Sequence, residues 1–477
     1  MDKDKKILAD DGVISLYLCL MLGVMITIIL IILKAARISA NGSQAVIVTD
    51  AAADSVLSEY NRDLLERYGL LFIDTSYGSG KGSVDKLIDR VRLYTGYNTD
   101  IKDDIRIVGN SLTDITADDI EITALSRATD DNGAVFRYMA ISYMLQHYGY
   151  AYVDAAGDMV DSSISQGLYD GDIVKENDDA EKAVADVDLP DIEGVDWDEV
   201  DTSSHTEEVS KSRHKGILKL VCKDKISDKG VDISLYASHR NLVVGNGMYE
   251  KWPEYNDVVD ELMFNEYILL KCGCKTEPVE KSVLDYEVEY VIYGYSNDND
   301  NLKKAAERLL LIRGTANSIY FFSHGEMSAE ASKMAADLAV VTLLPGLEPI
   351  YKAAIVAAWI YVESLNDVKI LLSGGKVPLI KEKGDWNISL KNAMTFNLKG
   401  GGSDKGFSYK DYLRLLLYIT DSEDKTKRMM DIVEMDIRNI SEHDAFALDD
   451  CIAAFKVQII YSCDDCSYLI QRSYGYW

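Results

Sequence analysis

An uninterrupted apolar stretch near the amino terminus, VISLYLCLMLGVMITIILIIL at 13–33, places the strongest constraint on how this chain can fold. It contains no charged residue, and fourteen of its side chains are valine, isoleucine or leucine. As a helix it would rise about 32 Å, which matches the hydrocarbon core of a bilayer. At roughly −0.3 to −0.6 kcal/mol per residue, insertion is favoured by about 4 to 8 kcal/mol. The stretch therefore predicts a single-pass transmembrane helix with the lipid bilayer as a partner.

Two other interpretations of this stretch are a cleaved signal peptide and a buried core helix. The apolar region of a signal peptide is shorter, about 7 to 15 residues. Basic residues flank the stretch on both sides: Lys3, Lys5 and Lys6 precede it, and Lys34 and Arg37 follow it. The small excess before the helix favours a short cytoplasmic tail at 1–12 and a large extracytoplasmic carboxy-terminal domain.

The charge balance of the chain excludes one class of partner. Acidic residues outnumber basic ones by 79 to 50, which gives a formal net charge of −29. Such a molecule repels nucleic acid and anionic lipid headgroups, so no nucleic-acid partner is expected. The chain also contains 30 tyrosines beside nine phenylalanines. Tyrosine suits broad contact surfaces because it combines an apolar ring with a hydrated hydroxyl, but this abundance names no ligand.

The helical pattern continues beyond the apolar stretch. Five side chains recur on one face at helical spacing: Ala53, Val56, Leu57, Tyr60 and Leu64. Gly69 follows as a helix C-cap. We expect one long helix, bent near Asn41–Gly42, to run from the bilayer into the first part of the folded domain, residues 34–169. In that part, residues 100–125 predict two strands, and 135–149 predict an amphipathic helix that faces the core.

Composition changes at about residue 170. Residues 170–212 are crowded with aspartate and glutamate and nearly free of large apolar side chains. Such a segment cannot bury enough apolar surface to offset the entropy of ordering it, so it predicts a flexible acidic linker or loop. Calcium binding by these carboxylates is the functional alternative, although no spaced DxDxDG loop is present.

The remaining part, residues 213–477, predicts central helices between strands. Ordered structure is expected to return at 216–222, and the alternation in LDYEVEYVIYG, 284–294, predicts a strand. Helices are expected at 301–312, 328–365, 409–420 and 425–439, and strands at 455–462 and 467–477. The apolar runs Leu338–Leu347 and Ala353–Val362 are too short to span a bilayer and predict buried core helices. This order predicts an α+β fold with an antiparallel sheet.

A glycine-rich segment, LLFIDTSYGSGKGSVDKLI at 70–88, predicts a strand, a loop and the start of a helix. It departs from a phosphate-binding loop at two positions, because Thr75 replaces the first glycine and Gly82 replaces the metal-binding hydroxyl. It also departs from a DxSxS adhesion metal site. Asp74 and Ser76 fit that pattern, but Gly78 occupies the third ligand position. A plain surface loop is the favoured interpretation.

Seven cysteines leave several possibilities open. Cys19 lies in the apolar stretch and is expected to pack as a small apolar residue. Six others lie outside it: Cys222, Cys272, Cys274, Cys451, Cys463 and Cys466. They could form one or more disulfides, and Cys272 and Cys274 could join Cys463 and Cys466 in a four-thiolate zinc site. The remaining alternative is free thiols.

The residues usually found in hydrolytic sites lack the spacing that catalysis requires. There is no HExxH or GxSxG pattern, and Ser323–His324 are merely adjacent in sequence. His205 and His214 are expected to be solvated beside the acidic segment. Glu363 and Asp367 could act as an acid/base pair on a helix. A solvated face or a salt bridge to Lys369 is the simpler interpretation, so no enzyme, catalytic residue, metal or cofactor is expected.

Several long segments resemble a known group of sequences. They are DGVISLYLCL with KAARISA, SEYNRDLLERYGLLFIDTSYG, EYVIYG, AAWIYVESLNDVKILLSGGKVPLIK, and SYKDYLRLLLYI with RMMDIVEMDIR. Together they resemble an uncharacterised bacterial membrane family, a domain of unknown function whose amino-terminal region is similar to the TadE/TadG pseudopilins of tight-adherence (Tad) pili. The resemblance leaves the acidic middle unmatched and brings no catalytic residues.

This resemblance implies a cell-surface protein with a membrane-embedded half-helix, continued by an amphipathic half that docks on a sheet. It also implies components of a Tad pilus or secretion apparatus as partners. Prepilins are cut after a glycine and carry glutamate at the fifth following position. If Gly12 were the cleavage site, Tyr17 would stand there. We therefore expect a permanently anchored accessory protein. The alternative is a surface-exposed binding or adhesion protein that acts on a cell-wall or partner ligand independently of pili.

Overall fold

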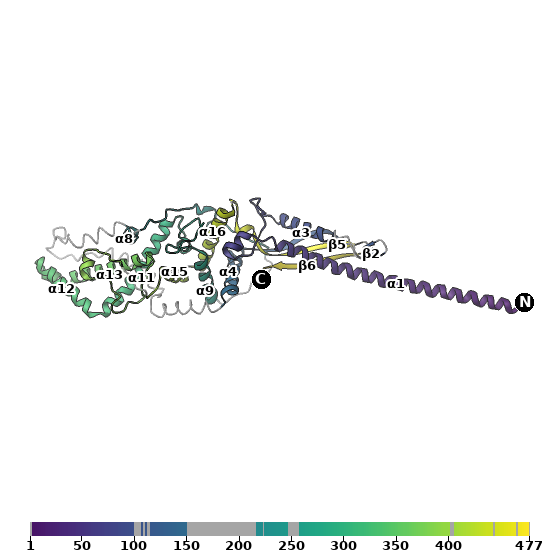
Figure 1. Ribbon diagram of the computed structural model, residues 1–477, viewed down its shortest axis with the longest axis horizontal. Coiled ribbons are helices and arrows are strands. Elements are labelled where there is room, and N and C mark those ends of the chain that lie inside the picture. Colours follow the sequence, from purple (N-terminus) through teal and green to yellow (C-terminus); the bar gives the residue numbers. More distant parts are fainter. Residues whose placement is uncertain are drawn as a thin grey trace.

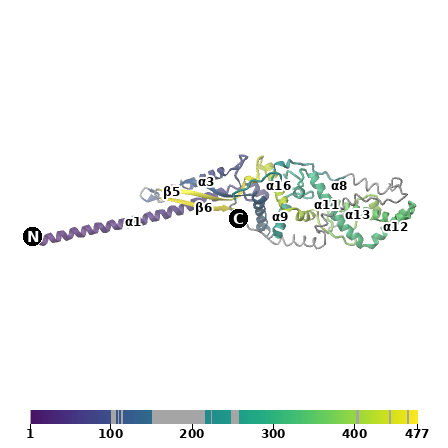
Figure 2. The same ribbon diagram turned by 180° about the vertical axis from the view of Figure 1, so that it is seen from behind.

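The computed structural model describes residues 2–99, 106–107, 110–111, 115–149, 216–222, 224–246, 257–400, 405–441, 444–463 and 466–476. The molecule is elongated, and helix α1 (Asp2–Leu57) extends from one end of it (Figure 1). A small sheet lies against the second half of α1, and a larger helical body follows. Helix α12 (Gly325–Val341) lies at the opposite end in both views (Figures 1 and 2). Mixed helix and antiparallel sheet confirm the predicted α+β class.

Helix α1 runs unbroken through Asn41–Gly42 and ends at Leu57, which is earlier than predicted. A separate helix, α2 (Arg62–Tyr68), begins where the side chain of Asn61 accepts a hydrogen bond from the Leu64 N–H. The prediction of one helix through Leu64 was therefore wrong, because this N-cap starts a new helix after a turn. Gly69 ends α2 in the left-handed conformation, as predicted.

The sheet is built around β5 (Cys451–Cys463). It pairs antiparallel with β4 (Thr116–Arg127), with β6 (Cys466–Gly475) and with the short β1 (Ile73–Asp74). The register places Ile459 opposite Ile120 on one side and Ile470 on the other. The two carboxy-terminal strands are thus confirmed. Of the two strands expected in 100–125, β4 is confirmed, and the first corresponds to a small separate hairpin, β2 (Arg106–Ile107) with β3 (Asn110–Ser111).

One face of the sheet is covered by the second half of α1 and by α3 (Val84–Thr99) (Figure 1). Alternate residues of β5 point to that face and are buried, because successive side chains of a strand point to opposite faces. They are Phe455, Val457, Ile459 and Tyr461. They pack in one apolar cluster with Val48 and Val56 of α1. This cluster fastens the long helix to the folded body.

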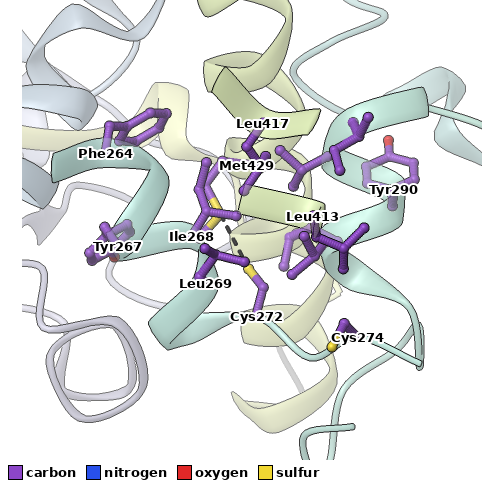
Figure 3. Close-up of a cluster of buried hydrophobic side chains, with 14 of the residues drawn as sticks. Phe264, Tyr267, Ile268, Leu269, Cys272, Cys274, Tyr290, Leu413, Leu417 and Met429 are labelled. Atoms are coloured by element: carbon purple, nitrogen blue, oxygen red, sulfur yellow. Dashed lines mark hydrogen bonds between the residues drawn. The ribbon is translucent and has the colours of Figure 1, made fainter. Parts of the chain in front are cut away.

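The helical body surrounds a second, larger apolar core. Its helices are α4 (Asp130–Tyr148), α8 (Ile217–Val221), α9 (Asp257–Lys271), α10 (Glu287–Tyr293), α15 (Tyr409–Ile419) and α16 (Ser422–Ser441). Figure 3 shows Ile268 of α9 on the side of that helix toward Leu413 of α15 and Met429 of α16, with Tyr267 turned away from them. The prediction that α4 faces the core is confirmed, since Phe136 and Met144 are buried.

The end of the body distant from α1 is made of α11 (Asp298–Ser323), α12, α13 (Glu348–Leu372) and the short α14 (Leu390–Met394). Three short 3-10 helices complete the described structure: Ile233–Leu235, Pro345–Leu347 and Leu448–Asp450. A third apolar cluster, including Phe321 and Trp359, holds these helices together. The helices expected at 301–312, 328–365, 409–420 and 425–439 are confirmed, with 328–365 divided between α12 and α13.

The strand predicted at 284–294 was wrong, because this segment contains helix α10. Its acidic side chains do not face solvent as alternation implied, and Glu287 and Glu289 are fully buried. Glu287 accepts a hydrogen bond from the Gly273 N–H (2.7 Å), and Glu289 accepts one from the Lys275 N–H (3.0 Å). Distant backbone donors therefore permit both carboxyls to be buried, and the local pattern gives no sign of these partners.

Burial of the two short apolar runs was predicted only in part. In Ala353–Val362, Ile355, Trp359 and Val362 are buried in α13. At the end of α12, however, Val340, Val341 and Leu343 are 71%, 78% and 83% exposed. In the same run Ala339 and Leu347 are buried, so the run at the outer end of the molecule is covered on one side only. The acidic segment predicted at 170–212 lies outside the described residues.

Candidate functional site

The contact between α1 and the sheet is the candidate functional site, because it joins the apolar stretch to the body. Residues 13–33 are exposed along their whole length, whereas from Asn41 onward every third or fourth side chain is buried. In the described chain, α1 is the helix long and apolar enough to cross a membrane. A signal sequence near the amino terminus has the same features. The two halves of α1 therefore meet different surroundings.

Tyrosine hydroxyls fasten the second half of α1 to the carboxy-terminal strands. Tyr461 and Thr49 share a hydrogen bond of 2.9 Å, and Tyr468 donates to the Ile38 carbonyl at 2.8 Å. Tyr474 donates to the Asp50 carboxylate at 2.5 Å, and Tyr476 donates to the Leu57 carbonyl. We call Tyr461, Tyr468, Tyr474 and Tyr476 the tyrosine clamp. Its contacts extend along α1 from residue 38 to residue 57.

Burial keeps three of these four hydroxyls protonated, so that they can donate hydrogen bonds. Burial raises the pKa of Tyr461, Tyr474 and Tyr476 above the usual value, and Asp50 raises the pKa of Tyr474 further. Gly42 lets the ring of Tyr468 approach the helix, since a Cβ there would lie 3.2 Å from the ring carbon Cε1. The glycine predicted to mark a bend is thus a point of close contact in an unbroken helix.

A disulfide closes the hairpin next to this clamp. Cys463 and Cys466 are bonded to each other at the turn between β5 and β6. The Cys466 Sγ atom lies 3.0 Å from the Tyr468 hydroxyl. Among the alternatives from sequence, one disulfide is therefore present. The hairpin is cross-linked where it meets α1 at Ile38.

The four-cysteine zinc arrangement is not assembled. Cys272 lies in the core of the body, with its Sγ 3.4 Å from the Met429 Sδ (Figure 3). Burial raises the pKa of Cys272 and Cys451, and it raises the pKa of Cys274 to about 11. These thiols are buried and protonated at neutral pH. In the described part of the chain, no three His, Cys, Asp or Glu side chains gather around a point that could hold a metal ion.

The glycine-rich loop at 70–88 joins β1 to α3 and uses its own polar groups internally. Asp74 accepts a hydrogen bond from the Ser76 N–H at 2.8 Å. The Lys86 ammonium donates to the carbonyls of Ser76 (3.2 Å) and Lys81 (2.7 Å). Gly82 is required by close packing, because a Cβ there would lie 2.3 Å from a carboxylate oxygen of Asp450. The segment is therefore an ordered loop whose polar groups bond to one another.

Glu363 and Asp367 come together, but the prediction of a solvated face was wrong. Both side chains are fully buried on α13. Asp367 pairs with the Arg313 Nε at 3.0 Å and with the Lys381 Nζ at 2.8 Å, and Lys381 also pairs with Glu363. Lys369 instead donates to the Leu398 carbonyl at 3.0 Å. The carboxylates are thus neutralised by cations that sequence analysis did not assign to them.

The same network binds backbone groups and links separate segments. Glu363 accepts hydrogen bonds from the N–H groups of Asn387 (2.9 Å) and Ile388 (2.7 Å). Arg313 donates to the carbonyls of Pro378 (2.9 Å) and Leu379 (2.7 Å). Burial raises the pKa of Glu363, with Lys381 opposing this shift. We interpret the network as a cross-link between α11, α13 and residues 378–388.

In the part of the chain that the structure describes, no histidine ring pairs with a carboxylate to form a catalytic triad. His324 Nδ1 lies 3.0 Å from the Ser323 Oγ and 2.8 Å from the Tyr320 carbonyl. No described carboxylate contacts His324. His147 stacks on a tyrosine ring. His239 contacts the Ser238 hydroxyl, which itself donates to the buried Asp431, so the serine rather than the histidine lies between the other two groups. The remaining histidines, His205, His214 and His443, lie outside the described residues.

Two further buried carboxyls with a raised pKa, those of Glu287 and Glu289, were not predicted as site residues from the sequence. Burial raises the pKa of Glu287 to about 8, with Asp436 adding to the shift. Burial also raises the pKa of Glu289 to about 7. Tyr409 donates to Glu289 at 2.8 Å, and Arg67 lies 3.9 Å from Glu287. In the sequence, Glu287 and Glu289 alternate with apolar residues, which predicts a strand with both carboxyls in solvent rather than buried.

These observations define a class of protein, one with a long apolar amino-terminal helix clamped to an α+β body. A family model described as a family of unknown function (DUF5702) matches residues 195–463, more than half of the 477-residue chain. The chain belongs to this family. No curated protein matches the chain, and no solved structure matches it either.

Proposed function

We propose that this chain is a non-enzymatic, membrane-anchored protein that holds its folded body on the extracytoplasmic side of the membrane. There it assists the assembly or anchoring of a Tad-type pilus or secretion apparatus. One observation carries the proposal: the exposed apolar half of α1 continues without a break into the half that the tyrosine clamp fastens to the sheet.

The unbroken helix determines how such an anchor would work. Ile38, where Tyr468 makes its contact, lies about 8 Å beyond Leu33 at the helical rise of 1.5 Å per residue. The disulfide-linked hairpin would therefore lie close to the lipid headgroups. Because no flexible linker separates the apolar stretch from the clamp, the body would project from the membrane at a fixed angle.

The disulfide supports an extracytoplasmic body. Disulfides persist in oxidising compartments and are rare in the cytosol. The bond between Cys463 and Cys466 lies at the end of the sheet nearest the apolar stretch. The small excess of lysine before residue 13 favours the same orientation.

The pseudopilin-like part of the proposal draws on sequence resemblance together with architecture. A helix with a membrane-embedded half and a half docked on an antiparallel sheet is the arrangement that the resemblance implies. Tyr17 stands where a prepilin cut after Gly12 would carry glutamate. The proposal is therefore an anchored accessory component rather than a repeating filament subunit.

Topology is tested by adding a protease to intact cells that contain the native full-length chain. Peptides from 216–476 should be released before lysis, while a cytoplasmic marker protein stays intact. Release of these peptides only after lysis would overturn the extracytoplasmic location. Recovery of the full-length chain in the soluble fraction, without detergent, would overturn the anchor.

The link to a Tad apparatus needs a separate test. A photo-crosslinking amino acid is placed at Ile47, which is 65% exposed on the half of α1 that contacts the sheet. We expect adducts with components of the apparatus, and none from the same substitution at the buried Val48. A source genome that lacks both a Tad secretion ATPase and a Tad platform protein would refute this part.

A further inference from the structure

A groove in the helical body has features that the anchoring role does not use. It has a volume of about 620 Å³ and lies between the loops at 225–229 and 275–286. This volume falls within the range of about 300 to 1,000 Å³ that is typical of small-molecule sites. We call it the lysine groove, after Lys225, Lys229 and Lys275, which line it with Asp285 and Tyr286.

The charge of the groove is opposite to that of the whole chain. Lys229 is neutralised, because its ammonium lies 2.8 Å from the Asp285 carboxylate. Neither Lys225 nor Lys275 forms an ion pair with a residue that the structure describes. One more carboxylate lines the groove, that of the exposed Asp228. The charged side chains that line the groove are thus three lysines and two aspartates, which gives it a net charge of +1 in a molecule with a net charge of −29.

Both walls of the groove are held by buried groups. Ser227 donates its N–H to the Tyr286 hydroxyl at 3.0 Å, and its own hydroxyl donates to the buried Asp298 at 2.7 Å. The Lys275 N–H donates to the buried Glu289 at 3.0 Å. Since these contacts already order the backbone, a ligand would lose little free energy to ordering the loops.

The turn that carries Lys275 is rigid as well. Cys274 and Glu277 exchange backbone hydrogen bonds of 3.1 and 3.0 Å. Gly273 permits this turn, because a Cβ there would lie 2.7 Å from the Val279 nitrogen. The Lys275 ammonium lies 5.8 Å from the centre of the Tyr286 ring, within reach of a cation–π contact. The Lys275 ammonium therefore lies beside the ring of Tyr286, on a part of the groove whose backbone is ordered.

We propose that the lysine groove binds a small ligand that carries a phosphate ester on a polyol or sugar. Lys225 and Lys275 would pair with the phosphate, since an ammonium is a compact charge suited to phosphate oxygens. Asp228 would accept hydrogen bonds from hydroxyl groups, and Pro278 and Ile226 would pack against carbon atoms. Nucleic acid is excluded by the net charge. The inference does not depend on which side of the membrane the body occupies.

The test measures binding to the full-length chain in detergent micelles by isothermal titration calorimetry. The probes are glycerol 3-phosphate, glucose 1-phosphate, inorganic phosphate and glucose. We expect the two esters to bind more tightly than inorganic phosphate or glucose. The double variant Lys225→Gln/Lys275→Gln should bind the esters about tenfold more weakly or worse, which corresponds to about 1.4 kcal/mol.

Matched variants separate the groove from general charge effects. Lys333→Gln removes an exposed lysine on α12, away from the groove, and should leave binding unchanged. Lys275→Arg keeps the charge and should retain most of the affinity. The inference is overturned if neither ester binds, if inorganic phosphate binds as tightly as the esters, or if the double variant binds them like the unmodified chain. Circular dichroism of each variant confirms that the body is folded.

Discussion

Removing the Asp367 carboxylate should strongly destabilise the body, because it would leave two buried cations without their shared partner. In the folded chain Asp367 accepts from Arg313 Nε (3.0 Å), Asn317 Nδ2 (2.9 Å) and Lys381 Nζ (2.8 Å). Lys381 keeps Glu363, but Arg313 would retain only neutral acceptors. Breaking a buried ion pair from one side costs about 3 to 5 kcal/mol. Asp367→Ala should therefore remove a large share of the roughly 5 to 15 kcal/mol that stabilises a typical domain.

Urea unfolding of the full-length chain in detergent, followed by tryptophan fluorescence, measures this loss. Trp359 and Trp386 both donate to the Ile388 carbonyl, beside the Glu363 contacts, so their emission reports on this region. Glu307→Gln is the matched control, because Glu307 pairs with Lys304 at the surface and should contribute about 0 to 1 kcal/mol.

A second variant distinguishes the loss of charge balance from the loss of packing. Arg313→Met/Asp367→Leu removes one charge of each sign and fills the space with apolar atoms. Replacing a buried ion pair by apolar residues of similar volume is often neutral or stabilising. This double variant should therefore be more stable than Asp367→Ala. A free energy of unfolding for Asp367→Ala within about 1 kcal/mol of the Glu307→Gln control would show that the Asp367 carboxylate does not stabilise the body in this way.

Three further predictions concern the anchor, the hairpin and pH. Val24→Arg should raise the cost of membrane insertion by about 3 kcal/mol and move part of the chain into the carbonate-soluble fraction, whereas Val24→Leu should not. Cys463→Ser should destabilise the hairpin by about 2 kcal/mol, the loop entropy of a four-residue ring, and dithiothreitol should do the same to the unmodified chain. Because the folded pKa of Glu289 is raised from 4.5 to about 7, its stabilising contribution is full below about pH 4.5 and is lost as pH rises through about 7. Urea unfolding between pH 5 and 7 should show a shallower decline for Glu289→Gln, and an unchanged slope would contradict the assignment.

Periodicity predicted the elements whose packing follows from their own side chains. The helices α15 and α16 and the strands β5 and β6 appear where apolar residues recur at helical or alternating spacing. Gly69 was recognised as a cap because glycine readily adopts the left-handed conformation that ends α2. In these cases a local pattern and its tertiary environment agree.

The wrong predictions concern residues whose hydrogen-bond or ion-pair partners lie far away in the sequence, so that the local pattern is misleading. Glu287 and Glu289 alternate with apolar residues as a solvent-facing strand would, yet backbone donors near 273–275 allow both to be buried in a helix. Asp367 has the helical spacing of a solvated pair with Glu363, but Arg313 and Lys381 approach it from 54 and 14 residues away. Sequence spacing cannot register such contacts, because the fold alone brings these residues together.

Composition and short-range periodicity were enough to predict the apolar amino-terminal helix, the α+β class and the antiparallel carboxy-terminal strands. The folded chain was needed to establish that α1 is one unbroken helix from the apolar stretch to the sheet. Tyr461, Tyr468, Tyr474 and Tyr476 reach it from more than 400 residues away in the chain. These hydrogen bonds form only when the fold brings α1 and the carboxy-terminal strands together, so neither segment alone determines their energy.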